Sequence, residues 1–470
     1  MTPFFARTLL RLYRGAGTVI YPFIGPFLRA RAARGKEDRA RRGERYGYAS
    51  AKRPDGPLVW LHAASVGESL AVAPLLERIE RLDVSIVLTT GTVTSAELAK
   101  QRVSERTQHQ YVPLDLQRAV GRFLDHWKPD LAIFAESEIW PTTIRELGRR
   151  NIPQILVNAR MSDRSNRRWQ QRQALAEAVF GQLAQVIAQS ETDAERFRAL
   201  GAPWVTVAGN LKSDVDLPQP DAATLATLQS QIGLRPTWLA ASTHAGEEES
   251  VAEVHALLLP HERNVLSILV PRHPDRCADI AAMLRSRGLT VVTRSSGEPI
   301  TNETQVFLGD TIGEMSLYMA LTRIVFMGKS LKGEGGQNPF EPAKAGAALL
   351  SGRYVQNFRE VYENLLRAGA ARLVRDEKML AGHVLHLMRN EHDRDVMVKA
   401  GLATVEEMAG AVDTTIRALD AYILPLRLRS GLERLRASDA GPNGGHDSRK
   451  DNGPDNGQDA VAKAKRAGRP

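Results

Sequence analysis

The sequence predicts an α/β protein made of two Rossmann-like, doubly wound domains. Short apolar segments alternate with stretches of helical periodicity, which is the pattern of βαβ units and parallel sheets. The segments fall into two series, separated by a polar stretch at residues 214–221 that contains Pro218 and Pro220. At 470 residues the chain also exceeds what one hydrophobic core usually supports. We therefore expect two domains facing a central cleft, with the carboxyl ends of the strands, where ligands bind in such folds, at its edges.

The predicted strands are short aliphatic runs bounded by turn-forming or charged residues. The first series comprises residues 58–62, 85–89, 131–134, 154–157 and 186–188. The second series comprises residues 238–241, 265–270, 290–293, 306–308, 324–327 and 347–350. From these two series we place the first domain at residues 48–217 and the second at residues 218–430.

The two ends of the chain differ from this body. Residues 1–47 are basic and apolar, whereas residues 437–470 consist mostly of Gly, Asn, Asp, Ser, Lys and Arg. The second stretch has too few apolar side chains to offset the entropy of ordering, so we expect a disordered tail. The single cysteine, Cys277, excludes an internal disulfide and fits a reducing compartment.

Most of the excess positive charge is concentrated near the N-terminus. The chain carries a formal net charge of +9. Residues 1–50 alone hold ten arginines and one lysine against three carboxylates. Apolar and aromatic side chains lie between these arginines, and they include Phe4, Phe5, Leu9, Leu10, Leu12, Tyr13, Val19, Ile20, Tyr21, Phe23, Ile24, Phe27 and Leu28. Basic groups beside aromatic ones favour an anionic lipid surface.

This N-terminal segment is predicted to lie on a membrane and not to cross it. Its apolar run, residues 16–28, is interrupted by Pro22 and Pro26 and is shorter than the roughly 20 residues that span a bilayer. The alternative is a pair of helices that packs on the body of the protein with a solvated basic face.

The loop after the first predicted strand carries a candidate general base. It reads His62-Ala-Ala-Ser65-Val-Gly67-Glu68 and leads into a helix. The spacing from Ser65 to Glu68 is that of a capping box, in which Glu68 would reach back to the Ser65 amide. The functional alternative is that Gly67 lets the backbone approach a ligand while Glu68 removes a proton from an acceptor hydroxyl.

Later loops of the first domain add further charged groups. Glu136 and Glu138 directly follow a predicted strand, where one could cap the next helix and the other could be free. The loops NARMSDRS and GNLKSD follow two more strands and carry Arg160 and Lys212. Four such loops on successive strand ends indicate a site at this edge of the sheet.

Three loops of the second domain favour an anionic ligand. Prolines on both sides of Arg272 and His273 stiffen the first loop, and an arginine held there can contact a phosphate through two hydrogen bonds. The second loop reads GDTIGEM and precedes a helix.

The third loop, GGQNPFE, predicts a helix start that could bind an anion. Asn338 is a good N-cap, Pro339 suits the first helical position and Glu341 falls where a capping glutamate would. The exposed helix amides would form an anion site, and a nucleoside phosphate with its ribose hydroxyls on Glu341 would fit.

Acidic residues elsewhere do not predict a metal site. Two Asp-x-Asp strings occur at residues 214–216 and 393–395, in the predicted linker and in a charged helix. His244, Glu247 and Glu248 have near-ligand spacing but lack the second histidine of a metalloprotease helix. We expect a reaction that needs no metal and no cofactor.

Taken in order, eight motifs resemble those of the bacterial 3-deoxy-D-manno-octulosonic acid (Kdo) transferases. They are LHAASVGE, ESEIWP, NARMSDRS, GNLKSD, ASTHAGEEE, LVPRHPDR, GDTIGEM and GGQNPFEPA. The resemblance extends from about Gly43 to about Ile423. It implies a GT-B fold in which the first domain binds a lipid A precursor (lipid IVA) as acceptor and the second binds CMP-Kdo as donor. It also implies lipopolysaccharide core biosynthesis at the cytoplasmic face of the inner membrane of a Gram-negative cell.

The resemblance also assigns roles to individual residues. It places the general base of an inverting transfer at Glu68 and the groups that assist the transition state at Glu136 and Lys212. The residues that it assigns to CMP contacts are Pro271, Arg272, Ile312, Gly313, Glu314, Asn338, Pro339, Phe340 and Glu341. The departures from the family pattern are Gln337, where some relatives have histidine, and Phe340, where leucine is commoner; neither removes a charged group.

Two other classes of protein share some of these features. A sugar-nucleotide epimerase or a transferase with a UDP donor would have the same two domains and the Asn338 site. A nucleic-acid-binding protein would explain the basic charge, but that charge is mixed with apolar residues and no nucleic-acid-binding motif is present. We therefore expect no nucleic acid among the partners.

Overall fold

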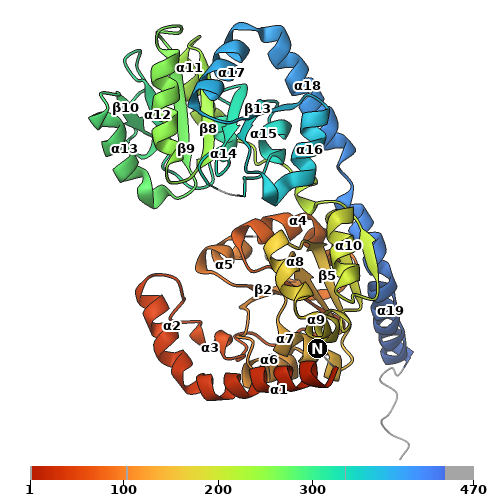
Figure 1. Cartoon of the computed structure of the whole chain (residues 1–470). Coiled ribbons are helices and arrows are strands. Elements are labelled where there is room, and N and C mark those ends of the chain that lie inside the picture. The colour runs from red at the N-terminus through yellow and green to blue at the C-terminus, as the bar shows by residue number, and fades with distance from the viewer. Residues whose placement is uncertain (1–2, 102–103, 334, 440–470) are drawn as a thin grey trace, which may run out of the picture. The chain divides into compact units, whose positions relative to one another are not determined.

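The computed structural model describes residues 3–101, 104–333 and 335–439. One compact unit, residues 1–427, contains two parallel seven-stranded sheets. A second unit, residues 428–470, holds the last part of helix α19 (Ala411–Asp439), and most of the predicted disordered tail lies outside the described residues. The predicted fold class, two Rossmann-like α/β halves, is confirmed; we call these halves the first lobe and the second lobe (Figure 1).

The first lobe contains strands β1 to β7 in the order β3-β2-β1-β4-β5-β6-β7. The strands are β1 (Leu58–His62), β2 (Ser85–Thr90), β3 (Thr107–Tyr111), β4 (Leu131–Ala135), β5 (Gln154–Ala159), β6 (Gln185–Ala188) and β7 (Val205–Val207). The helices between them are α4 (Val66–Glu80), α5 (Val93–Lys100), α6 (Gln117–Trp127), α7 (Pro141–Arg149), α8 (Asp163–Gln170), α9 (Gln173–Phe180) and α10 (Glu191–Ala199). Reversal of the strand order at β1 and β4 is the topological switch point where ligands bind in such sheets.

The second lobe repeats this pattern with strands β8 to β14 in the order β10-β11-β9-β8-β12-β13-β14. The strands are β8 (Thr237–Thr243), β9 (Leu266–Pro271), β10 (Val291–Thr293), β11 (Val306–Leu308), β12 (Ile324–Met327), β13 (Ala348–Gly352) and β14 (Ala371–Val374). The helices are α11 (Ala222–Ile232), α12 (Glu247–Leu258), α13 (Cys277–Ser286), α14 (Met315–Met319), α15 (Phe340–Lys344), α16 (Arg359–Arg367), α17 (Glu377–Arg389) and α18 (Glu391–Glu407).

Both sheets are buried on both faces. In β1, Val59 and Leu61 belong to one hydrophobic cluster, whereas Leu58 and Trp60 belong to another on the opposite face. The second lobe likewise has one cluster on each face of its sheet. Strands covered on two faces are continuous apolar runs, which is why the sequence reveals them so clearly.

The N-terminal segment folds as helices that contact the first lobe. It comprises α1 (Pro3–Ile20), a 3-10 turn, η1 (Tyr21–Phe23), α2 (Ile24–Ala33) and α3 (Arg42–Arg45). Helix α1 packs against α6 and α9, and Ile24 and Leu28 of α2 are buried. The predicted alternative, helices that pack on the body, therefore describes much of this segment. Within the described residues, no helix contains an apolar stretch long enough to cross a bilayer.

Helix α19 contributes to the core of the first lobe and not to that of the second. Ala411, Leu419, Ile423 and Leu426 are buried in the same cluster as Val59 and strands of the first sheet. The sequence-based boundary, which assigned residues up to 430 to the second domain, is therefore wrong for this helix. The sequence does not reveal this crossover, because the residues of a helix do not show which of two sheets the helix will cover.

Candidate active site

The carboxyl ends of β1, β4 and β5 form one edge of the first sheet, which we call the first edge. The three strands are adjacent and parallel. Glu68 lies on α4 after β1, Glu136 and Glu138 directly follow β4, and Asn158 is near the end of β5. Lys212 lies in a 3-10 turn, η2, that follows β7. The structure thus brings the predicted residues Glu68, Glu136 and Lys212 to the same edge.

Glu68 is held by its own loop in the first turn of α4. Ser65 caps this helix and accepts a hydrogen bond from the Glu68 amide at 3.3 Å. The Glu68 carboxylate accepts from the Ala64 amide at 2.8 Å and from the Ser65 hydroxyl at 2.9 Å. The expected capping contact is therefore real, but the backbone donor that Glu68 reaches is Ala64 and not Ser65. The capping interpretation is thus confirmed, while the role of Glu68 as a general base stays a prediction.

The surroundings of Glu68 favour its protonated form. Burial raises its pKa from an ordinary value of 4.5 to about 7, and the nearby carboxylates of Glu138 and Glu136 add to this rise. The hydrogen bonds from Ala64 and Ser65 act in the opposite direction and lower the pKa. A carboxyl group with a pKa near neutrality can take up and release protons under cellular conditions, as a general base requires.

Glu136 is paired with Lys212 through a strained segment of backbone. Glu136 has a φ of 55°, in the left-handed region, and its amide donates to the Val157 carbonyl at 2.9 Å. This turn directs the carboxylate toward Lys212, whose Nζ donates to Oε1 at 2.7 Å. The Lys212 ammonium also lies 5.5 Å from the centre of the Phe358 ring. A non-glycine residue in this conformation is uncommon and occurs most often at functional sites.

A network of amide side chains fixes the turn that carries Lys212. Asn158 is buried, has a φ of 50°, and accepts a hydrogen bond from the Leu211 amide at 3.0 Å. Asn210 accepts from the Lys212 amide at 3.1 Å and donates to Gln189 at 3.2 Å. The sequence analysis did not identify Asn158 and Asn210 as supporting residues, although both lie within the motifs that it singled out.

The NARMSDRS loop contacts the second lobe. Arg160 donates to Oδ1 of Asn357 at 2.9 Å, and Asp163 pairs with Arg359 at 3.0 Å. Asp163 also pairs with Arg196 of α10, and these arginines lower the pKa of Asp163, Arg196 more than Arg359. Arg160 and Asp163 therefore connect two parts of the chain.

The second lobe has an equivalent edge, formed by the carboxyl ends of β11, β9, β8 and β12, which we call the second edge. These strands are adjacent and parallel. The predicted CMP-contact segments follow β9, β11 and β12, so the structure places all three at this edge. The structure thus brings the three predicted segments together, while their contacts with CMP stay a prediction.

Arg272 presents an exposed side chain at the second edge. Its backbone amide donates to the Thr243 carbonyl at 3.0 Å, which fixes the start of its loop. Pro271, by contrast, is the buried last residue of β9. The Arg272 guanidinium helps to lower the pKa of Glu341, so its charge acts across the loops that meet there.

A pair of histidines lies next to Arg272. The rings of His244 and His273 meet edge to face with their centres 5.5 Å apart. The Gln337 amide nitrogen lies 3.0 Å from Nε2 of His244, so it donates and Nε2 accepts. Burial and the charge of Lys329 lower the pKa of His244, which keeps this ring neutral. Gln337, one of the two departures from the family pattern, thus has a defined role in orienting His244.

Glu247 and Glu248 have structural roles that the sequence analysis did not find. Glu247 is fully buried, and its two carboxylate oxygens accept hydrogen bonds from the backbone amides of His244, Lys329, Ser330 and Leu331, at 2.6–3.0 Å. Glu248 is also buried and forms a bidentate ion pair with Arg276, with N–O distances of 2.9 and 3.0 Å. The sequence feature that could have indicated these roles is the acidic first turn of α12, which contains both residues.

The GDTIGEM loop presents an exposed tip. Ile312 is 80% exposed, and Gly313 has a φ of +88°, which favours glycine. Glu314 accepts hydrogen bonds from Thr311 and, at 3.0 Å, from Arg294. Arg294 was not predicted, and it leaves Glu314 already paired within the second lobe.

Asn338 and Glu341 interact through their side chains, but the N-cap is Pro339 and not the predicted Asn338, so the helix starts one residue later than expected. Helix α15 begins at Phe340, and Oδ1 of Asn338 accepts from the Phe340 amide at 3.2 Å. Nδ2 of Asn338 donates to Glu341 at 3.0 Å. Burial raises the pKa of Glu341, while Asn338, Arg272 and Lys212 lower it. Helix α15 has only five residues, so its dipole is weak. It therefore gives less support to the predicted anion site than a longer helix would.

Phe340, Pro339 and Pro271 cannot contact a ligand with exposed side chains. All three are buried, and Phe340 belongs to the core of the second lobe. A contact from any of them with CMP would have to come from the main chain.

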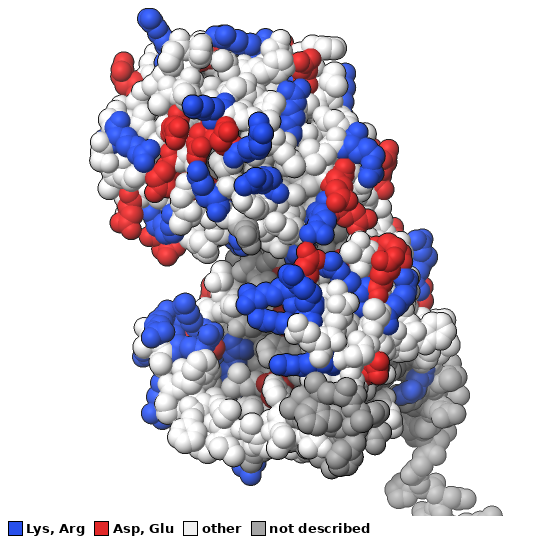
Figure 2. All heavy atoms as spheres, in the orientation of Figure 1, with Lys and Arg blue, Asp and Glu red and all other residues white. Residues whose placement is uncertain are grey.

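Two surfaces of the first lobe combine exposure with charge or apolar character. Helix α8 has no buried residue, and its arginines 164, 167 and 168 are exposed. Figure 2 shows basic side chains gathered over α8. On α1, η1 and α2 the exposed large apolar residues are Leu12, Tyr13, Val19, Ile20, Phe23 and Phe27.

Several arginines of the N-terminal segment form ion pairs with nearby glutamates. Arg31 and Arg45 pair with Glu37 at 2.9 and 3.1 Å, and Arg41 pairs with Glu44 at 2.8 Å. These arginines stabilise the fold of the segment, so fewer of its charges face solvent than the sequence suggested. The expected membrane association of the segment stays a prediction.

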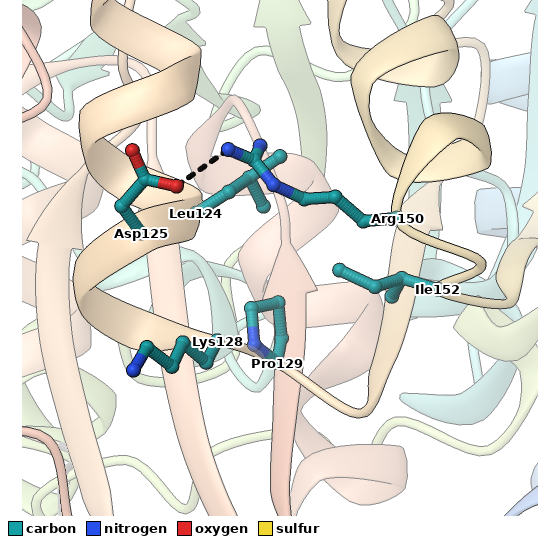
Figure 3. Close-up of a pocket in the computed structure, with 6 residues that line it drawn as sticks. All are labelled: Leu124, Asp125, Lys128, Pro129, Arg150 and Ile152. Atoms are coloured by element: carbon teal, nitrogen blue, oxygen red, sulfur yellow. Dashed lines mark hydrogen bonds and ion pairs between the residues drawn. The ribbon is translucent and has the colours of Figure 1, made fainter.

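A cavity of about 580 Å³ lies away from both edges (Figure 3). Arg150 extends across it and donates to Asp125 at 2.5 Å, with Lys128 and Ile152 also in the lining. Lys128 precedes β4 and Ile152 precedes β5, so the cavity opens at the amino end of the first sheet. It is therefore separate from the candidate active site.

Solved structures match this architecture. A putative UDP-N-acetylglucosamine 2-epimerase from Listeria monocytogenes superposes with a TM-score of 0.55, at 13% identity, over 78% of this chain and 97% of that chain. The C-terminal CMP-Kdo binding domain of WaaA from Acinetobacter baumannii is 29% identical and matches 39% of this chain and 97% of that domain, with a TM-score of 0.38. Two doubly wound lobes of this type define the GT-B fold.

Sequence comparisons identify the family. The family model described as 3-Deoxy-D-manno-octulosonic-acid transferase (kdotransferase) matches residues 40–215. The 3-deoxy-D-manno-octulosonic acid transferase of Haemophilus influenzae is 34% identical over 414 residues, covering 86% of this chain and 96% of that protein. The protein is thus a glycosyltransferase with a GT-B fold. It belongs to the 3-deoxy-D-manno-octulosonic acid transferase family.

Proposed function

We propose that this protein transfers Kdo from CMP-Kdo to a lipid A precursor, lipid IVA, with inversion at the anomeric carbon and with Glu68 as the general base. Membership of the family supports the donor and the transferred sugar. The observation that carries the catalytic proposal is the pKa of about 7 at Glu68, on a carboxyl group fixed at the switch-point edge of the first sheet.

In this mechanism Glu68 acts on the acceptor. Its carboxylate removes the proton from a glucosamine hydroxyl while the hydroxyl oxygen forms a bond to the anomeric carbon of Kdo. The bond from that carbon to the phosphate oxygen breaks, and its electron pair leaves with CMP. Attack on the face opposite the leaving group inverts the configuration, and the proton remains on Glu68 until it passes to water.

Positive groups then stabilise the charges that develop. The transition state has oxocarbenium character at the sugar and growing negative charge on the phosphate. We assign the phosphate to Arg272, which is exposed at the second edge and can donate two hydrogen bonds. We assign Lys212, held by Glu136 at 2.7 Å, to the Kdo carboxylate or the departing phosphate. Donors placed where charge develops can contribute several kcal/mol, of order 3 per group.

We further propose that the reaction needs no metal and no cofactor. Three of the four carboxylates of the two Asp-x-Asp strings already have partners in this fold. Asp214 accepts from the amides of Gly410 and Val412, Asp393 pairs with His386, and Asp395 pairs with Arg323. Among the described residues, no three His, Cys, Asp or Glu side chains converge as a metal site. Activity that is unchanged in excess chelator would support this proposal, and activity restored only by a divalent ion would overturn it.

We place the enzyme at the cytoplasmic face of the inner membrane, where its lipid acceptor is reached from the surface. The exposed apolar side chains of α1, η1 and α2 would enter the interface between lipid and water, as amphipathic helices do. The exposed arginines of α8 begin five residues after β5 and suit a phosphorylated acceptor.

A direct transfer assay tests the proposal. Purified protein is incubated with CMP-Kdo and a tetraacylated lipid A precursor, and the product is analysed by mass spectrometry. We expect the acceptor to gain mass in steps of one Kdo residue, and no gain with Glu68→Gln. A titration comparing CMP with UDP tests the donor separately; tighter binding of UDP would indicate a different sugar-nucleotide enzyme.

A further inference from the structure

A buried histidine lies directly beneath the carboxylates of the first edge. His62 is the last residue of β1 and has no exposed surface. Its Nε2 lies 3.7 Å from Oε2 of Glu138, at the beginning of the loop that follows β4. Because β1 and β4 are adjacent parallel strands, the pair is fixed by the sheet itself.

Hydrogen bonds on the other side of the ring determine where its first proton lies. Nδ1 of His62 is 3.0 Å from the Thr89 carbonyl oxygen and 2.9 Å from the Thr89 hydroxyl. A carbonyl can only accept, so Nδ1 carries a hydrogen and donates it. In a neutral ring, Nε2 would then be a bare acceptor that faces a carboxylate oxygen.

That arrangement would be unfavourable without a proton on Nε2. Nε2 is buried and has no hydrogen-bond partner among the described residues. Oε2 of Glu138 already accepts from the indole of Trp140 at 2.8 Å, so it also offers no donor. A proton on Nε2 turns two opposed acceptors into an ion pair and removes the cost of an unsatisfied buried group, about 1–3 kcal/mol.

Glu138 in turn acts on Glu68. Its negative charge is the largest contribution, after burial, to the raised pKa of Glu68, ahead of that of Glu136. The charged groups that face this point are Glu68 on α4, Glu136 and Glu138 after β4, Lys212 on η2 and His62 on β1. Lys212 is already paired with Glu136 at 2.7 Å, which leaves His62 as the cation next to Glu138.

We propose that His62 is a positioning residue for the transfer reaction: protonated at Nε2, it pairs with Glu138 and limits the negative charge that Glu138 imposes on Glu68. This inference rests on the proposed function, in which Glu68 is the base. His62 is too deeply buried to touch either substrate and acts only through Glu138. It keeps enough of Glu68 ionised near neutral pH for the base to work.

The second lobe contains a histidine that provides a matched control. His255 is also fully buried, its Nδ1 lies 2.8 Å from the Ser267 hydroxyl, and its Nε2 has no partner among the described residues. Trp238 donates to Ser267 just as Trp60 donates to Thr89. Among the described residues His255 has no acidic partner, and burial lowers the pKa of its ring to about 4.

The test is the pH dependence of kcat in three variants. In His62→Gln the charge of Glu138 is unopposed, so Glu68 holds its proton more firmly and the acid limb of the profile moves to higher pH. In Glu138→Gln a negative charge next to Glu68 is lost, and the limb moves to lower pH. We expect shifts of about 0.5 to 1 pH unit in opposite directions. His255→Gln should leave the limb in place.

A second measurement does not depend on activity. With ¹³C-labelled histidine, the ring of His62, assigned by its absence in His62→Gln, should be protonated in the wild-type protein at pH 7.5 and neutral in Glu138→Gln. His255 should be neutral in both. This arm still reports on the pair if His62→Gln fails to fold, or if no Kdo transfer is detected and the proposed function is itself wrong.

Each outcome decides the proposal. Opposite shifts of the acid limb together with a protonated His62 support it. Shifts in the same direction, an unchanged limb in both variants, or a neutral His62 ring in the wild-type protein overturn it. A lower kcat with an unmoved limb would indicate that His62 has only a packing role.

Discussion

The two lobes share one topology, yet their carboxyl edges have opposite chemistry. At the first edge Glu68, Glu136 and Glu138 lie together with Lys212 as the cation paired to one of them. At the second edge Arg272 is exposed, and His244, whose ring pKa is lowered by burial, lies near it. Under the proposed function, the same order of strands presents a base on one lobe and a phosphate-binding cation on the other, because the loops that follow the strands differ.

The two edges differ in which carboxylates already have hydrogen-bond or ion-pair partners. In the second lobe Glu247 accepts four backbone amides, Glu248 is paired with Arg276, and Glu314 with Arg294. Such contacts stabilise the loops of the second edge. In the first lobe burial, and then the like charges of Glu138 and Glu136, raise the pKa of Glu68 to about 7, so this carboxylate can accept a proton near neutral pH.

The largest expected effect is that of Glu68→Gln. The amide keeps the size of the side chain but cannot accept the acceptor proton, so kcat should fall by about 10²–10⁴-fold. The measurement is the rate of transfer to the lipid acceptor at saturating CMP-Kdo. CMP affinity, measured by calorimetry, should be unchanged. A variant that keeps more than half of the wild-type rate would remove Glu68 from the mechanism.

Next in size is the loss of stability in Glu247→Gln. The amide replaces one acceptor oxygen with a donor that faces backbone N–H groups, which leaves buried amides unsatisfied. We expect the free energy of unfolding to fall by about 3 kcal/mol, measured by urea denaturation. Glu249→Gln, an exposed neighbour on the same helix, is the control and should change it little. Equal stability of the two variants would show that the four amides do not depend on this carboxylate.

Arg272→Gln should weaken the binding of CMP and leave the first edge intact. Loss of a charge-assisted contact to phosphate corresponds to about 1.5–3 kcal/mol, or roughly 10–100-fold in Kd. The matched control is Arg263→Gln, which removes an exposed arginine that precedes β9, whereas Arg272 follows the carboxyl end of the same strand. If cytidine, which lacks the phosphate, loses as much affinity as CMP, Arg272 does not bind the phosphate.

A smaller effect is expected from the arginines of α8. Replacing Arg164, Arg167 and Arg168 together with glutamine should raise KM for a bisphosphorylated lipid acceptor about tenfold, because three exposed charge contacts are lost. KM for CMP-Kdo should not change. The control replaces Arg263 and Arg375, two exposed arginines of the second lobe. An equal rise with a phosphate-free acceptor would argue against phosphate recognition by α8.

The sequence predicted the central strands of both sheets and missed three of the edges. All the predicted strands are present, whereas β3, β7 and β14 were not foreseen, and each ends a sheet. Central strands are covered on two faces and read as apolar runs. An edge strand such as Thr107–Tyr111, with the sequence TQHQY, has polar side chains and lacks that signal. The apolar pattern therefore indicates that a segment is buried, and does not by itself indicate that it forms a strand.

For the site, too, the sequence predicted features that depend on neighbouring residues but not contacts between distant ones. Motif resemblance located Glu68, Glu136 and Lys212, and the structure places them at one edge. It could not reveal the buried contact between His62 and Glu138, because residues far apart in sequence meet only once β1 and β4 pair. Helix α19 is a similar case, since its return to the first lobe follows from packing and not from composition.

The smallest expected effect concerns stability and again separates the two edges. Folded Glu68 keeps its proton up to about pH 7, whereas in the unfolded chain it is lost near the ordinary value of 4.5. Between these values the folded state binds more protons, so the contribution of Glu68 to the free energy of unfolding falls as pH rises through this range. Glu68→Gln lacks this term, and its urea midpoint should match that of the wild type near pH 5 and gain on it toward pH 8. The gain should be modest because Glu68 is only partly buried and water screens its charge. A constant difference between the two proteins across this range would mean that Glu68 does not titrate near neutrality, and the first edge would then hold an ordinary carboxylate instead of a poised base.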